Sequence, residues 1–144
     1  MRLGISEILR KANDAPDDAS RVAILLQHDS PTLRNMLELA LDPRVKWALP
    51  EGNPPFKPND LVDQQHRLYT EMRKMYLFLE GGNPNLNQTR REYLFIELLE
   101  TLDPEDAKLV LAAKDKKIPY SNITAKVVAT AFPVFTSHED RKSG

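Results

Sequence analysis

The residues best suited to chemistry are the basic, hydroxyl and amide side chains gathered between positions 114 and 126, in the sequence KDKKIPYSNITAK. Pro119 breaks the helical pattern, and Ser121 or Asn122 is a typical N-cap for a helix that follows. The first N–H groups of a helix lack partners inside it and attract anions. Flanking lysines would add contacts to phosphate oxygens. The segment therefore predicts a grip on a nucleic-acid backbone, with no reading of the bases.

The candidate nucleic-acid-binding residues are polar or basic side chains of this segment and two arginines at an earlier helix start. They are Lys114, Lys116, Lys117, Tyr120, Ser121, Asn122, Thr124, Lys126, Arg90 and Arg91. A second interpretation stays open: the lysines offset the dipole at a helix end beside an ordinary N-cap. The two arginines of NQTRREY could likewise pair with Glu92 or with the acids that follow.

Charge is segregated along the chain, although its net value is only −1. Six acids and no base lie between Glu92 and Asp106, and five lysines with one acid lie between Lys108 and Lys126. Paired carboxylates could act as general acid and base. We interpret the acidic block as a solvated helix end followed by a charged helix start.

Enzyme and metal signatures are missing from the sequence. It has no phosphate-binding glycine loop, no GxSxG, no HExxH and no cysteine. Its histidines, His28, His66 and His138, have spacings that zinc-binding helices do not use. We therefore expect a protein that is not an enzyme, with no catalytic residues, no cofactor and no metal.

Length and composition suit one folded domain, since 144 residues with 41% apolar residues can bury a core. No apolar run is long enough to span a membrane, and the first residues lack a signal-peptide core. We expect one domain over residues 1–136, a flexible tail over 137–144, and a place in the host cytoplasm or in a virion.

The elements that would position the candidate residues are helices. Ser30-Pro31 and Asp103-Pro104 are typical helix starts. The apolar spacing predicts a short first helix with Ile5, Ile8 and Leu9 on one face, a second that starts near Asp17 to Ser20 and buries Val22, Leu25 and Leu26, and a regular third that buries Leu33, Met36, Leu37, Ala40 and Leu41. Four prolines exclude a helix from 50–60. We further expect a long helix from Asn59-Asp60 to Gly81-Gly82, helices over 87–101 and 103–114, and a last helix capped by Ser121 or Asn122. The residues expected to face inward include Tyr76 of the long helix, Tyr93 of the helix over 87–101, and Val127, Val128 and Ala131 of the last helix. The fold class is a single all-α domain of six to eight helices.

Nearly the whole chain resembles uncharacterised small proteins of T4-like phages that infect cyanobacteria, in segments such as LLQHDSPTLR, LPEGNPPFKP and RLYTEMRKMYLFLEGGNPNLNQTRRE. It also resembles the N-terminal DNA-binding domain of T4-type ATP-dependent DNA ligases, in ISEILRKA, LRNMLELALDPRVKWALP and DAKLVLAAKDKKIPYSNITAKVVATAFPVF. In that domain a basic helix end, a turn and a new helix start hold the DNA backbone. The resemblance implies DNA contacts at Lys114, Lys116, Lys117, Ser121, Asn122, Thr124 and Lys126.

Two departures separate the chain from those ligases. Pro119-Tyr120 occupies a turn in which ligases usually have glycine, and the catalytic motif Lys-x-Asp/Asn-Gly is absent. The resemblance therefore implies DNA binding without ligation. Our main hypothesis is a non-catalytic, sequence-tolerant DNA-binding phage protein whose partner is duplex DNA. The alternative is a module that binds a phage or host protein through its segregated charge and its proline-rich loop. Phe56 would anchor that loop, unless it folds back onto the domain's own core.

Overall fold

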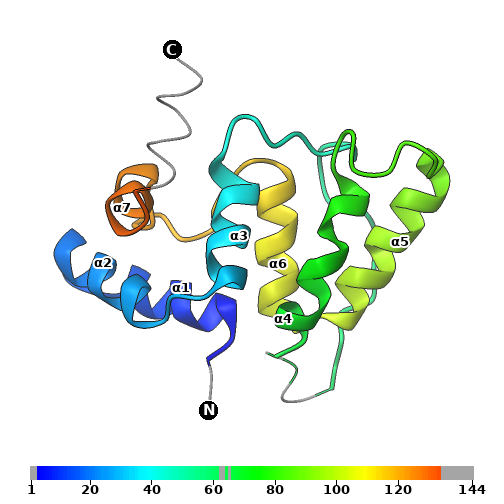
Figure 1. Ribbon diagram of the computed structural model, residues 1–144. Coiled ribbons are helices and arrows are strands. Elements are labelled where there is room, and N and C mark those ends of the chain that lie inside the picture. The colour runs from blue at the N-terminus through cyan, green and yellow to red at the C-terminus, as the bar shows by residue number, and fades with distance from the viewer. Residues whose placement is uncertain (1–2, 62–63, 65, 134–144) are drawn as a thin grey trace.

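The computed structural model describes residues 3–61, 64 and 66–133, and this part of the chain is helical (Figure 1). The helices are α1 (Ile5–Asn13), α2 (Asp18–Gln27), α3 (Pro31–Leu41), α4 (Arg67–Glu71), the 3₁₀ helix η1 (Met72–Phe78), α5 (Gln88–Thr101), α6 (Pro104–Lys114) and α7 (Ala125–Ala131). Within the described residues no strand forms, and the one isolated bridge joins Trp47 to Leu79. The predicted all-α fold is confirmed. None of the described helices is both long and apolar enough to cross a membrane.

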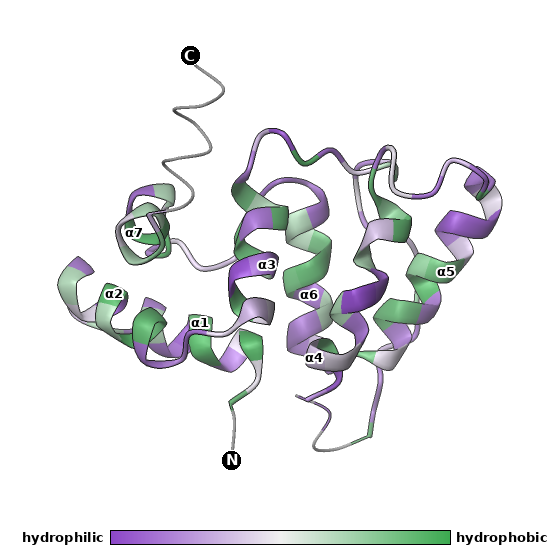
Figure 2. Ribbon diagram, in the orientation of Figure 1, coloured by the Kyte–Doolittle hydropathy of each residue, from purple (hydrophilic) through white to green (hydrophobic). Residues whose placement is uncertain are grey.

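Helix α6 lies at the centre because its sequence leaves it no fully polar face. Its consecutive residues Leu109, Val110 and Leu111 are all buried, as are Ala107 and Ala113. A helix that is apolar around most of its circumference must be surrounded by others. Helices α1, α3 and α5 all contact it, and Figure 2 shows it as a hydrophobic segment in the middle of the molecule. Helices α1, α2 and α7 lie at one end of the molecule, and α4, η1 and α5 lie at the other (Figure 1).

The predicted helix starts are confirmed by their side-chain caps. Asp17 accepts a hydrogen bond from the Ser20 N–H at 2.8 Å, and the Ser30 hydroxyl accepts one from Leu33 at 3.1 Å. Asn87 caps α5 in the same way, at 2.8 Å from the N–H of Arg90. Each cap satisfies an N–H that has no partner within its own helix.

The long helix expected from Asn59 to Gly82 is wrong. The described helix begins at Arg67 and changes after Glu71 into η1, which ends at Phe78. A 3₁₀ helix has three residues per turn. Met75 and Phe78 therefore share its buried face, whereas Tyr76, which a period of 3.6 had placed inside, is exposed.

The predicted cap at the start of this helix is also wrong, and the helix ends at Phe78, before the glycines that were expected to end it. The Asn59 side chain does not cap it: its Nδ2 donates to the Thr101 carbonyl, and its Oδ1 accepts from the N–H of Leu61. Gly81 has a φ of +80° in the turn beyond the helix, a conformation that glycine adopts without strain.

The predictions of which other residues face inward are partly confirmed and partly wrong. Val127, Val128 and Ala131 of α7 are buried, as the sequence predicted. Tyr93 was expected inside but is 53% exposed, because α5 buries Phe95 instead. The Phe95 ring meets the Phe78 ring edge to face at 5.2 Å. Leu26 of α2, also expected inside, is exposed.

The last helix starts later than predicted. It begins at Ala125 under a Thr124 cap, whose hydroxyl accepts from the Val127 N–H at 3.2 Å. The predicted caps Ser121 and Asn122 precede it, and Asn122 is instead bonded to the end of α1. The expected tail over 137–144 lies outside the described residues.

The proline-rich segment, residues 50–60, runs without helix along α5 and α6 and is called the strap below. The Lys57 N–H donates to the Glu100 carboxylate at 2.8 Å, and Asn59 bonds to the Thr101 carbonyl at 2.9 Å. Phe56 is half-buried and packs against the core. The strap is therefore attached to the domain by its own polar groups and by Phe56.

Candidate nucleic-acid interface

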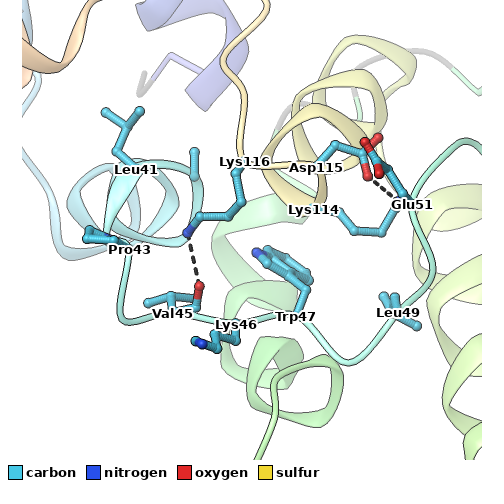
Figure 3. Close-up of a pocket in the computed structure, with 11 residues that line it drawn as sticks. Leu41, Pro43, Val45, Lys46, Trp47, Leu49, Glu51, Lys114, Asp115 and Lys116 are labelled. Atoms are coloured by element: carbon cyan, nitrogen blue, oxygen red, sulfur yellow. Dashed lines mark hydrogen bonds and ion pairs between the residues drawn. The ribbon is translucent and has the colours of Figure 1, made fainter.

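Lys114 occupies the last turn of α6, and its ammonium group points into the protein. The Nζ atom lies 2.8 Å from the Pro50 carbonyl oxygen and 2.7 Å from Asp115 Oδ1. Its side chain is only 1% exposed. A buried, paired ammonium joins the strap to α6 and cannot reach a phosphate (Figure 3).

Lys116 has the backbone conformation that ends α6. Its φ of +62° is left-handed, a region in which glycine is usual after a helix. The N–H of Lys117 donates to the Ala112 carbonyl at 2.8 Å, and the N–H of Lys116 donates to Ala113 at 2.9 Å. These two bonds make a Schellman motif, which satisfies carbonyls that the helix leaves free.

The Lys116 side chain then caps a different helix. Its Nζ donates to the carbonyls of Leu39 at 3.1 Å, Asp42 at 2.7 Å and Val45 at 3.1 Å, at and just beyond the end of α3. Figure 3 shows the bond to Val45. Burial lowers the pKa of Lys116, and the Asp42 carboxylate opposes that shift. Three carbonyl partners still require three N–H donors, which only the ammonium form has. Its charge thus faces the negative end of the α3 dipole.

A groove of about 690 Å³ lies between the ends of α3 and α6 (Figure 3). Its walls are mostly aliphatic or aromatic and include Leu41, Pro43, Val45, Trp47 and Leu49. The Trp47 Nε1 donates to the Leu39 carbonyl at 3.1 Å, and the ammonium groups of Lys114 and Lys116 bond to the protein. These polar atoms are already satisfied, so they are not poised to hold a cofactor or a reacting group.

The segment from Lys117 to Lys126 contains the predicted residues that remain at the surface. Lys117, Ser121, Thr124 and Lys126 are exposed. Asn122 is exposed too, although its N–H donates to Asn13 Oδ1 at 2.8 Å and its Nδ2 donates to the Asn13 carbonyl at 3.0 Å. These two bonds fix the segment against the end of α1.

Tyr120 of the same segment is half-buried beside acids. Its hydroxyl lies 3.4 Å from Glu105 Oε2, and burial together with that carboxylate raises the pKa of Tyr120 to about 12. The hydroxyl therefore stays protonated and turned toward Glu105. Its position suits a packing role better than a phosphate contact.

Arg90 and Arg91 lie on α5, at the other end of the molecule from α7 (Figure 1). Arg91 is hydrogen-bonded within the protein: its guanidinium donates to the carbonyls of Leu77 at 3.0 Å and Leu86 at 3.0 Å. Arg90 is exposed, and its guanidinium carbon lies 5.4 Å from the centre of the Tyr93 ring. The structure thus separates these arginines from the lysine segment.

Asp106 is a structurally important residue whose role the sequence reasoning missed. Its side chain is fully buried, and its Oδ1 accepts from the Ser6 N–H of α1 at 3.0 Å. Burial raises its pKa from 3.8 to about 6, against the hydrogen bonds from Ser6 and with help from the charges of Asp103 and Glu7. The only sequence signal was an acid in the first turn of α6 and a glycine, which cannot cap by side chain, before α1.

The acidic block does not assemble into a catalytic pair. Glu105 meets Arg10 at 3.4 Å, Glu100 accepts from the strap, and Asp106 lies inside the protein. Among the described residues, no three acidic, histidine or cysteine side chains form a group able to hold a metal ion.

Comparison with known proteins identifies a family whose function is unknown. The family model described as "Family of unknown function (DUF6433)" matches residues 8–120. No curated protein matches the chain. No solved structure matches it either.

Proposed function

The chain belongs to this family of unknown function, and from that premise we propose that it is a non-catalytic DNA-binding protein. It would hold the phosphate backbone of duplex DNA through residues 117–126, with little dependence on base sequence. This binding segment is shorter than residues 114–126, which the sequence predicted, because the ammonium groups of Lys114 and Lys116 are bonded inside the protein.

The observation that supports this proposal most is the exposure of a segment that contains no acid of its own. Residues 117–126 include two lysines and no acid. Lys117 and Lys126 are exposed at its two ends, with Ser121 and the helix-capping Thr124 exposed between them. Lysine ammonium and hydroxyl groups are the donors that proteins use for phosphate oxygens. The proposal therefore rests on donors that the fold leaves at the surface.

The resemblance to ligase DNA-binding domains supports the same segment. Lys117, Ser121, Asn122, Thr124 and Lys126 are positions at which that resemblance implies backbone contacts, and all five are exposed. We further propose that the protein is phage-encoded and acts in the cytoplasm of the infected cell.

The number of exposed lysines limits the affinity. Each phosphate that a protein neutralises adds about 0.9 to the slope of log K against log salt, so two lysines give a slope near −1.8. Binding should then weaken about twelvefold between 50 and 200 mM salt. Such weak and salt-sensitive binding would be non-specific.

The test is fluorescence anisotropy of a labelled DNA duplex at low salt, with two double variants of equal charge change. Lys117→Glu with Lys126→Glu removes the proposed contacts and should abolish measurable binding. Lys57→Glu with Arg73→Glu alters exposed bases on the strap and on η1 and should leave most of the binding intact. Lys116 is left unchanged because its substitution would uncap α3. Equal losses in both double variants, or no binding by the natural chain, would refute the proposal.

The alternative function is a module that binds another protein through the strap, and the structure supports it less than it supports the DNA-binding proposal. Phe56, its proposed anchor, is half-buried against the core, and both Lys57 and Asn59 bond the strap to α5. A strap held in this way offers a partner no free aromatic anchor at Phe56.

A further inference from the structure

Helix α5 forms one edge of the molecule and has an outer stripe of exposed residues that the proposed DNA binding does not use (Figure 1). Arg90, Tyr93 and Glu97 are spaced at i, i+3 and i+7, which places them on one side of the helix. Tyr93 is 53% exposed, so a large part of its aromatic ring faces solvent. Tyrosine and arginine are the residue types most often found at the centres of protein interfaces.

The stripe is complementary to itself when one copy is turned end to end. An antiparallel pair of α5 helices, with its twofold axis between positions 93 and 94, places Arg90 opposite Glu97 of the copy. The same axis places the two Tyr93 rings together in the middle. A parallel pair would instead bring Arg90 against Arg90 and Glu97 against Glu97. We propose that α5 is the interface of a symmetric, antiparallel homodimer.

A second copy suits these charges because the stripe cannot satisfy them alone. Arg90 and Glu97 are seven residues apart, about 10 Å along the helix, which is too far for an ion pair within it. Within residues 3–61, 64 and 66–133 neither side chain forms an ion pair, and Lys74, near Glu97, pairs with Glu71 at 2.8 Å. A twofold interface pairs both charges of both copies at once.

The surface around Tyr93 also has room for a ring from a second copy. A shallow hollow of about 480 Å³ is lined by Asn87, Thr89, Arg90 and Tyr93. The Arg90 guanidinium already covers one side of the Tyr93 ring, at 5.4 Å from its centre. A tyrosine from the copy could pack against this pair, and aromatic contacts of this kind add to area burial.

The proposed interface is small. Helix α5 has 14 residues and is therefore about 21 Å long. A single helix pair of this length buries less than the roughly 800 Å² per partner typical of stable complexes. The dimer should be weak and favoured by low salt and high concentration. It does not depend on DNA binding, although two copies would present two 117–126 segments to one duplex.

Sedimentation velocity of the full chain at low salt, in a concentration series up to about 1 mM, tests the dimer without DNA. Arg90→Glu and Glu97→Arg should each raise the dissociation constant about tenfold or more, because each breaks two ion pairs and creates repulsion. The double variant exchanges the charges and should return the constant to within about threefold of the natural value.

Arg73→Glu is the matched control, since it reverses an exposed arginine of η1 outside the stripe and should change nothing. Circular dichroism would verify that each variant is folded. A natural chain that stays monomeric at about 1 mM overturns the proposal. So does a double variant as weak as the single ones, because only an Arg90–Glu97 contact between copies predicts recovery.

Discussion

Lysines that are close in sequence have different roles in this molecule, because some are bonded inside the protein and others are exposed. Lys114 and Lys116 bond through their ammonium groups to the strap and to the end of α3, whereas Lys117 and Lys126 are exposed to solvent. The first two stabilise the fold, and the last two remain available to a ligand. A basic cluster in a sequence is thus not yet a basic surface, because the end of a buried helix needs cations of its own.

The difference between Lys116 and Lys117 follows from one backbone turn. Lys116 is left-handed, which ends α6 and directs its side chain toward the carbonyls at the end of α3. Lys117 follows that turn and is exposed. Neighbouring residues at a helix end therefore face different environments.

The largest expected effect concerns Lys114. Lys114→Met leaves the Pro50 carbonyl without its donor and the Asp115 carboxylate without its cation, in a site that is nearly closed to water. We expect a loss of about 3 kcal/mol in the free energy of unfolding. Urea denaturation measures it, and Lys117→Met, an exposed control, should change the same quantity by less than about 0.5 kcal/mol. Similar losses in the two variants would mean that the buried Lys114 stabilises the fold no more than the exposed Lys117 does.

Asp106 is a buried carboxylic acid of which only one oxygen has a hydrogen-bond partner in the protein. Its Oδ1 has the Ser6 N–H, but its buried Oδ2 has no hydrogen-bond partner, and the pKa of this acid is raised from 3.8 to about 6. The folded state therefore binds the proton more tightly than the unfolded state. Stability is favoured at low pH and falls as the pH rises from about 4 to about 6.

Asp106→Asn removes this titration while keeping an oxygen for Ser6. Between pH 4 and pH 7 the natural protein should lose about 2 kcal/mol of stability relative to the variant. Thermal or urea unfolding of both proteins at the two pH values gives the difference, in which the other titrating groups cancel. A difference between the two proteins that does not vary with pH would show that Asp106 is ionised as easily as an exposed acid.

The smallest effect separates the two roles of Lys116. Lys116→Met and Lys116→Gly both lose the ammonium group, but only glycine relieves the left-handed backbone at φ +62°. The glycine variant should be the more stable of the two by about 1 kcal/mol. Calorimetric melting of the two variants measures this, and an equal melting temperature would mean that the turn relaxes without cost.

The sequence predicted the parts of the fold that depend on local chemistry. The caps at Asp17, Ser30 and Asn87 satisfy N–H groups within three residues, so their positions could be read directly. Helix α3 likewise buries Leu33 and Met36 as its spacing predicted. The change from α4 to η1 could not be read this way, because it reflects packing of Phe78 against Phe95 from another helix.

The candidate site was harder to predict, because its lysines bond to residues far away in sequence. Lys114 reaches Pro50, and Lys116 reaches Leu39, Asp42 and Val45, all more than 60 positions earlier. Nothing in the spacing of KDKK distinguishes a lysine that caps a distant helix from one in solvent. Arg91 was misplaced for the same reason, since its partners include the Leu77 carbonyl at the end of η1.

The bond between Ser6 and Asp106 also bears on how the molecule folds. Helix α1 begins after Gly4, which has no side chain for a cap, and the Ser6 N–H finds its acceptor 100 residues later in α6. The first turn of α1 thus gains this acceptor only after α6 has docked. Amide hydrogen exchange at Ser6 would then require α1 and α6 to separate, so its rate reports how often the N-terminal helix detaches from α6.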